Sequence, residues 1–190
     1  DGAAVTGCEV IVVGPDDLPV ATGVDGEILV RGPMLALGYL EDGNVETKMQ
    51  QVAVAMLLAL ETGMRSSEII GLAWSQVRGK HVHLPMTKNG AERDVPLSRR
   101  AVELLEKMRG VDKQQVFTVD AASRDALFRK ARARCKIVGL TFHDTRHTAV
   151  TRLASLVDVL TLAKIIGHRD VKSLMIYYNP SVDEIADRLG

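Results

Sequence analysis

Six side chains in the part of the chain after residue 50 could together break a phosphodiester bond without a metal ion. They are Arg65, Lys88, His143, Arg146, His168 and Tyr177. Such a reaction on DNA needs a nucleophile, cations that neutralise the non-bridging oxygens as charge builds up, and an acid for the leaving 5′-oxygen. A tyrosine hydroxyl can attack phosphorus, guanidinium groups can supply the cations, and lysine or histidine can supply the proton. These residue types predict metal-free phosphoryl transfer.

The six residues lie in short motifs that follow one another in a fixed order. The first two motifs are T-G-M-R-S-S-E at 62–68 and the turn sequence T-K-N-G at 87–90. The next two are F-H-D-T-R-H-T at 142–148, which contains a His-x-x-Arg pattern, and I-G-H at 166–168. Tyr177 follows the last histidine by nine residues.

This order closely resembles the signature of the tyrosine recombinases, the phage-type integrases. Their pattern is an arginine, a hairpin lysine, His-x-x-Arg, Gly-His and then a tyrosine. The resemblance covers roughly residues 51–185, and five spaced motifs in the correct order make it specific. It implies site-specific DNA cleavage and rejoining through a 3′-phosphotyrosyl intermediate, with no cofactor and no ATP, because the phosphotyrosine conserves the bond energy.

The resemblance also implies a role for each charged residue. Arg65 and Arg146 would clamp the scissile phosphate, since a planar guanidinium donates two parallel hydrogen bonds and stays charged. Lys88, at the tip of a hairpin, would protonate the leaving oxygen. Glu68 would orient Arg65 or another group of the pocket.

For the remaining site residues, the resemblance implies phosphate contact and nucleophilic attack. His143 and His168 would hydrogen-bond the phosphate and assist proton transfer. Tyr177 would attack the phosphorus, and an ordinary tyrosine, with a pKa of roughly 10, needs a cationic pocket and a nearby base to do so. The adjacent Tyr178 is the alternative nucleophile, but the nine-residue spacing favours Tyr177.

Taken singly, these residues have simpler interpretations. Arg65 could be a solvated cation at a helix start, and Lys88 an ordinary surface lysine. His143 and His147, four residues apart, could form a metal-binding pair, but Arg146 between them would repel a cation and no glutamate follows His143 as in a zinc protease. The joint pattern favours the catalytic interpretation.

The net charge of zero hides an asymmetry along the chain. Residues 1–50 hold nine acidic and two basic side chains, a net charge of −7, whereas residues 51–190 hold twenty-two basic and fifteen acidic side chains, a net charge of +7. A basic domain suggests an anionic partner, most plausibly double-stranded DNA. Arg129, Arg132 and Lys136 fall on one face of an expected helix, where they could follow a phosphate backbone or simply be solvated.

The residues after about 45 are expected to be mostly helical. The expected helices are 51–62, 67–72, 99–109, one that Asp120 or Ser123 would cap and that runs to about 137, 143–155, 158–166, 170–178 and 181–189. Strands at 80–84 and 92–97 would flank the turn at 88–90 as a β-hairpin. The fold class is therefore mainly α (α+β): a tyrosine recombinase catalytic-domain fold with a small β-hairpin, preceded by a β-rich N-terminal segment.

Residues 1–40 have a β pattern rather than the helical pattern of the later residues, with expected strands at 8–13 and 27–30. Their sequence resembles part of the adenylate-forming enzymes, the acyl-CoA synthetase superfamily. Residues 41–50 would be a linker, and residues 51–190 the catalytic domain, lacking the family's first helix and its N-terminal DNA-clamping domain. This combination suggests a chimeric chain whose N-terminal segment packs on the helical domain.

The interpretation as a recombinase has one main alternative, a DNA-binding module or chimera that keeps the fold without turnover. By family resemblance we expect self-association on DNA, as a tetramer, and no membrane or small-molecule substrate as partner. The longest apolar run, at 52–60, is too short to cross a bilayer. Cys8 and Cys135 share no motif spacing and fit unpaired thiols in a reducing cytoplasm.

Overall fold

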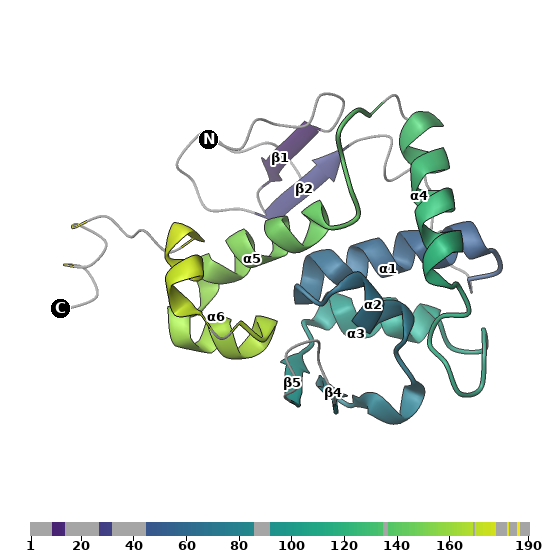
Figure 1. Ribbon diagram of the computed structural model, residues 1–190, viewed down its shortest axis with the longest axis horizontal. Coiled ribbons are helices and arrows are strands. Elements are labelled where there is room, and N and C mark those ends of the chain that lie inside the picture. The colour runs from purple at the N-terminus through teal and green to yellow at the C-terminus, as the bar shows by residue number, and fades with distance from the viewer. Residues whose placement is uncertain are drawn as a thin grey trace.

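The computed structural model in Figure 1 describes residues 9–13, 27–31, 45–85, 92–134, 137–168 and 170–177, together with positions 182 and 186. The helices are α1 (Lys48–Thr62), α2 (Ser66–Ile70), η2 (Trp74–Gln76), α3 (Arg99–Lys107), α4 (Ala121–Arg134), α5 (Asp144–Leu156), α6 (Val159–Ile166) and η3 (Val171–Tyr177). The strands are β1 (Glu9–Val13), β2 (Glu27–Arg31), β3 (Val77–Arg78), β4 (His81–Leu84) and β5 (Arg93–Pro96). The expected mainly α fold with a small hairpin is confirmed.

Helix α1 is the central element, and residues on every side of it are buried. It contacts α2, α3, α4 and α5, which surround it in Figure 1. It begins three residues before the expected start at 51, because Thr47 and Gln50 form a capping box. The Thr47 hydroxyl accepts from the Gln50 N–H at 3.2 Å, and the Gln50 side chain accepts from the Thr47 N–H at 2.8 Å.

The apolar side chains form two separate clusters. The α1 cluster joins α1 to α2, α3, α4 and the sheet, and includes Leu58, Met64, Ile69, Leu104 and Phe128. The α6 cluster joins α5, α6 and η3, and includes Val150, Ala154, Leu162, Ile166 and Leu174. The proposed catalytic residues are divided between the segments that carry these two clusters, so the site depends on what joins them.

The small sheet has the antiparallel order β3-β4-β5. Val82 pairs with Val95 and Leu84 pairs with Arg93, which confirms the hairpin expected on either side of residue 88. Strand β3 was not expected from the sequence, because two residues are too few for an alternating pattern. Along β5 the side chains alternate between buried and exposed, and Arg93 lies on the buried side with Val95.

Strands β1 and β2 pair antiparallel, with Glu9 opposite Arg31 and Val13 opposite Glu27. Their bounds agree with the strands expected at 8–13 and 27–30. The proposal that residues 1–40 pack on the helical domain stays a prediction. The linker expected at 41–50 is shorter than predicted, because residues 48–50 form the start of α1, and residues 41–44 lie outside the described residues. The turn expected at 88–90 also lies outside them.

Two details near the termini of helices refine the expectations. Asp120 caps α4, since its carboxylate accepts from the Ser123 N–H at 2.8 Å, so Ser123 is not the cap. The helix expected at 170–178 is a 3-10 helix over Val171–Tyr177. Pro180 follows three residues later in the sequence, and a proline disfavours the α conformation of the residue before it. The helix expected at 181–189 falls almost wholly outside the described residues. Within the described part of the chain, no helix has the length and apolar character to span a membrane.

The burial of α1 gives a first prediction. Leu58 is fully buried in the α1 cluster, so Leu58→Ala should lower the free energy of unfolding by roughly 2–5 kcal/mol through lost contacts and a cavity. Leu156, which is 67% exposed at the end of α5, provides the control, because Leu156→Ala should change stability by only about 0.5 kcal/mol. Urea denaturation measures both, and equal losses would contradict this placement of α1.

Candidate active site

Helices α1 and α6 both end at a glycine with left-handed backbone. Gly63 has φ 64° and ψ 13°, and Gly167 has φ 67° and ψ 43°. Such a glycine closes a helix and turns the chain away from its axis. Two residues beyond Gly63 lies Arg65, and directly after Gly167 lies His168. Gly63 and Gly167 therefore turn the chain so that Arg65 and His168 lie beyond the ends of α1 and α6.

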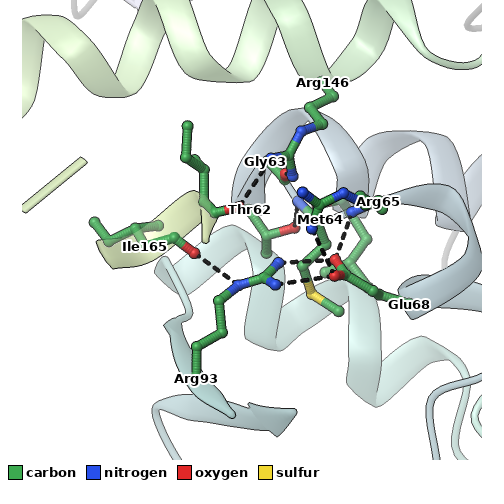
Figure 2. Close-up of polar contacts among 10 residues, drawn as sticks. Thr62, Gly63, Met64, Arg65, Glu68, Arg93, Arg146 and Ile165 are labelled. Atoms are coloured by element: carbon green, nitrogen blue, oxygen red, sulfur yellow. Dashed lines mark hydrogen bonds and ion pairs between the residues drawn. The ribbon is translucent and has the colours of Figure 1, made fainter. Parts of the chain in front are cut away.

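Arg146, buried on α5, joins these two helix ends. Its Nη1 donates to the Gly63 carbonyl, as Figure 2 shows, and its Nη2 donates to the Ile166 carbonyl at 2.8 Å. These carbonyls lack partners within their helices, and a cation there also offsets the negative end of each helix dipole. Burial lowers the pKa of Arg146 to about 10, and the charges of Arg65 and Arg93 contribute to this. Arg146 is still cationic at neutral pH.

Glu68 connects Arg65 to a second buried arginine, Arg93 (Figure 2). The Glu68 carboxylate accepts from the Arg65 N–H at 2.8 Å and from Arg65 Nη1 at 3.1 Å. It also accepts from Arg93 Nη1 at 2.9 Å and Nη2 at 2.8 Å, a two-pronged ion pair. Burial raises the pKa of Glu68, but hydrogen bonds and charges from both arginines outweigh it and hold that pKa below its ordinary value. Glu68 therefore fixes Arg65 as an ionised carboxylate.

Arg93 also ties the β-hairpin to the end of α6. Its Nε donates to the Ile165 carbonyl at 3.1 Å, and its side chain lies against Gly167. A Cβ at position 167 would come within 2.9 Å of Arg93 Nη1. The glycine of the Gly-His motif is thus required both by its backbone conformation and by this close approach.

His168 lies near the two arginines of the site. Burial lowers the pKa of His168, and the charges of Arg146 and Arg65 lower it further. The imidazole is therefore more readily neutral at physiological pH than an ordinary histidine, and in the neutral form it can donate or accept a hydrogen bond without adding another positive charge.

Tyr177, at the end of η3, meets α5 through a histidine that the sequence analysis did not assign to catalysis. The Tyr177 hydroxyl lies 2.7 Å from Nδ1 of His147. His143 contacts the same imidazole edge to face, with ring centroids 5.1 Å apart. Because His147 directly follows Arg146 on α5, this contact brings the phenol to the part of α5 that carries the buried guanidinium.

The structure thus brings together Arg65, Glu68, Arg146, His168 and Tyr177, with His143 reaching the tyrosine through His147. Such a cluster offers several hydrogen-bond donors for an anion, with a phenol nearby that could attack it. Lys88, Lys136 and the alternative nucleophile Tyr178 lie outside the described residues.

The other basic candidates lie elsewhere. Arg129 is exposed on α4, and Arg132 Nη1 donates to the Leu140 carbonyl at 2.7 Å. Figure 1 shows α4 at the end of the molecule opposite α6. Arg132 is thus bonded within the fold, and Arg129 and Arg132 do not belong to the cluster around Arg146.

The sequence contained signals for both residues that were missed. Arg93 alternates with Val95 and Leu97, which places an arginine on the inner face of a strand and indicates a buried ion pair. His147 directly follows Arg146 and lies one helical turn after His143, but that spacing was considered only as a metal pair. Among the described residues, no group of three or more histidine, cysteine, aspartate or glutamate side chains could hold a metal ion.

Comparison with known proteins identifies a family and a fold for the chain. The model of the phage integrase family matches residues 40–184. The chain is 40% identical to the shufflon-specific DNA recombinase of Escherichia coli, over 70% of this chain and 35% of that protein. The catalytic domain of bacteriophage HP1 integrase is similar with a TM-score of 0.62 and 25% identity, over 83% of this chain and 89% of that one. The Tn1549 transposon integrase in complex with a circular intermediate DNA has the same fold, with a TM-score of 0.62, 18% identity, and coverage of 92% and 68%.

The fold and the site define a catalytic domain of the integrase type. The chain belongs to the phage integrase family. It spans half or less of the length of the curated relatives it matches. The family model leaves residues 1–39 unmatched.

The contact between Gly167 and Arg93 yields a prediction about stability. Gly79 also has left-handed backbone, with φ 61°, but a Cβ there would meet nothing within 4 Å. Gly79→Ala should therefore cost about 1–2 kcal/mol for the backbone alone. Gly167→Ala should cost roughly 3 kcal/mol or more, because Arg93 must also leave Glu68 and the Ile165 carbonyl. Urea denaturation measures the free energy of unfolding of both variants. Equal decreases would show that the Arg93 side chain can move aside without a cost in stability, which would contradict the prediction.

The electrostatics of His168 yield a second prediction. Removing a nearby cation makes the protonated imidazole less unfavourable, so Arg65→Gln should raise the pKa of His168 toward its ordinary value. An NMR titration of the histidine ring protons measures this shift. Arg99→Gln, which removes an exposed arginine of α3, is the control and should leave the His168 titration in place. If the pKa of His168 is the same in Arg65→Gln as in the wild-type chain, Arg65 does not lie close enough to His168 to belong to the same site.

Proposed function

We propose that this chain is the catalytic domain of a site-specific DNA recombinase that cuts and rejoins double-stranded DNA through a 3′-phosphotyrosyl intermediate. The observation that carries the proposal is that Arg146 joins the ends of α1 and α6, which Arg65 and His168 follow, while Tyr177 contacts the residue after Arg146. Membership of the phage integrase family and the solved integrase complex with DNA support it.

In the proposed reaction, Arg65 and Arg146 bind the non-bridging oxygens of the scissile phosphate. Two of the five N–H donors of Arg146 are used on helix carbonyls, which leaves others for the phosphate. Glu68 holds Arg65 in place, while His143 and His168 hydrogen-bond the phosphate and assist proton transfer. These roles fit the order of the motifs and the position of each side chain.

The bonds change as follows. The Tyr177 hydroxyl oxygen bonds to phosphorus, and the bond between phosphorus and the 5′-oxygen breaks. The 5′-oxygen leaves with the electron pair and takes a proton, which Lys88 would supply from the hairpin tip. Because the phosphotyrosyl ester replaces one phosphoester with another, the free 5′-hydroxyl can reverse the step and rejoin the strand. The reaction consumes no ATP and uses no cofactor.

Further parts of the proposal concern the whole protein. Self-association on DNA, as a tetramer, and a place in the cytoplasm follow from the family resemblance. Arg129, Arg132 and Lys136 are proposed phosphate contacts on and beside α4. Residues 1–40 are proposed as a separate segment, similar to adenylate-forming enzymes, that is joined to the recombinase domain.

Covalent trapping tests the proposed function. Supercoiled plasmid is incubated with the protein in EDTA, and denaturing gels detect protein joined to DNA. The wild-type chain should form an adduct, Tyr177→Phe should abolish it because phenylalanine has no nucleophile, and Tyr178→Phe, the matched control, should retain it.

Three outcomes would contradict this proposal. An adduct that persists in Tyr177→Phe would exclude Tyr177 as the nucleophile. A requirement for a divalent cation would exclude the metal-free reaction. DNA binding by the folded wild-type chain with no adduct would favour the alternative, a DNA-binding domain without turnover.

A further inference from the structure

The contact between His147 and Tyr177 has a defined geometry. Nδ1 of His147 lies 2.7 Å from the Tyr177 hydroxyl, and the two rings are tilted by 36° with their centroids 6.3 Å apart. The contact joins α5 to η3, thirty residues further along the chain. With the proton of the neutral imidazole on Nε2, Nδ1 accepts the phenolic hydrogen bond.

This partner suits the chemistry that a tyrosine nucleophile needs. A phenol attacks phosphorus well only as it loses its proton, and a neutral imidazole within hydrogen-bond distance can take that proton. His147 is exposed, so a proton on its ring can pass on to water. His143 lies at the edge of the His147 ring instead, and its contact with the tyrosine is indirect.

A carboxylate lies one helical turn before His147, at Asp144. The Thr141 N–H donates to Asp144 at 2.6 Å and holds the pKa of Asp144 below its usual range, and the charges of His147 and His143 contribute to this. Asp144 therefore carries a negative charge at neutral pH, three residues before His147 on α5.

We propose that His147 is the general base that removes the Tyr177 proton during DNA cleavage, a role that rests on the proposed function of this site. The proton moves from the Tyr177 oxygen to Nδ1 of His147 as that oxygen bonds to phosphorus. In the rejoining direction, the imidazolium returns the proton to the departing tyrosine. His143 is then left to contact the phosphate.

Other titratable groups around α5 must be separated from His147 in any pH profile. On α5 itself they include His143, Asp144, Arg146 and Arg152. The elements packed against α5 contribute Lys48 and Glu61 of α1, Lys164 of α6, and Lys172 and Tyr177 of η3. Glu61 is bonded to Arg152 and Ser98. These groups are present in both the wild-type chain and a His147 variant. The ratio of their rates of adduct formation at each pH therefore isolates the contribution of His147.

The test compares His147→Asn with the wild-type chain in the plasmid trapping assay. The asparagine amide can keep an oxygen near the position of Nδ1, so it can accept the hydrogen bond but cannot carry the proton. Adduct formation should slow by about 100-fold or more, while DNA binding is unchanged. The difference in rate between His147→Asn and the wild-type chain should decrease as the pH rises, because hydroxide then takes the phenolic proton. In a second variant, His147→Gly, added imidazole should restore part of the rate of adduct formation.

A control variant on the same helix shows whether the effect is specific to His147. Thr151→Ala, one turn after His147 on the same exposed side of α5, should keep the wild-type rate. Full activity of His147→Asn, or a deficit that is constant with pH, would overturn the role of general base.

The hydrogen bond itself can be tested without any reaction. In the free protein, the ring nitrogen resonances of His147 should change in Tyr177→Phe, because Nδ1 loses its donor. No change would overturn the inference even if the wild-type chain forms adducts. If the wild-type chain forms none, the proposed function fails separately, and this NMR comparison still decides whether His147 binds the tyrosine.

Discussion

The site depends on the pairing of two buried arginines and one partly buried arginine with the carbonyl ends of two helices. Arg146 binds the last carbonyls of α1 and α6, Arg93 binds Ile165 of α6, and Arg152 binds the carbonyls of Leu60 and Glu61. These carbonyls have no partner within their own helices, and leaving them unpaired in the interior would be costly. The α1 cluster and the α6 cluster are separate, and these arginines, together with the packing of α1 on α5, hold the two halves of the site together.

The same arrangement makes the site electrostatically ready for an anion. Arg65 and Arg93 are bonded to one carboxylate, Glu68. Burial lowers the pKa values of Arg146 and His168, and the charges of neighbouring arginines lower them further. A bound phosphate would relieve this excess of positive charge, since it adds negative charge where cations are already fixed. The helix caps that stabilise the fold thus also prepare its binding chemistry, which explains why the motif residues cluster at helix ends.

Much of the fold and of the site could be predicted from the sequence. The helices, the hairpin and the ends at Gly63 and Gly167 follow from local periodicity and turn residues, with boundaries shifted by a few residues. Helix α1 began early because of the capping box at Thr47, and η3 wound more tightly than expected. Strand β3 was missed because pairing, rather than its own two residues, makes it a strand.

The sequence by itself determined the chemistry available: which residues are cationic, which is nucleophilic, and in what order they occur along the helices. That order carried the family resemblance, because motif spacing is a local property of the chain. Only the tertiary structure decided that Arg93 joins Glu68 to the end of α6 and that His147, rather than His143, contacts Tyr177. Both contacts join segments twenty-five or more residues apart. Such pairings are fixed by how the helices pack, and no local pattern records that packing.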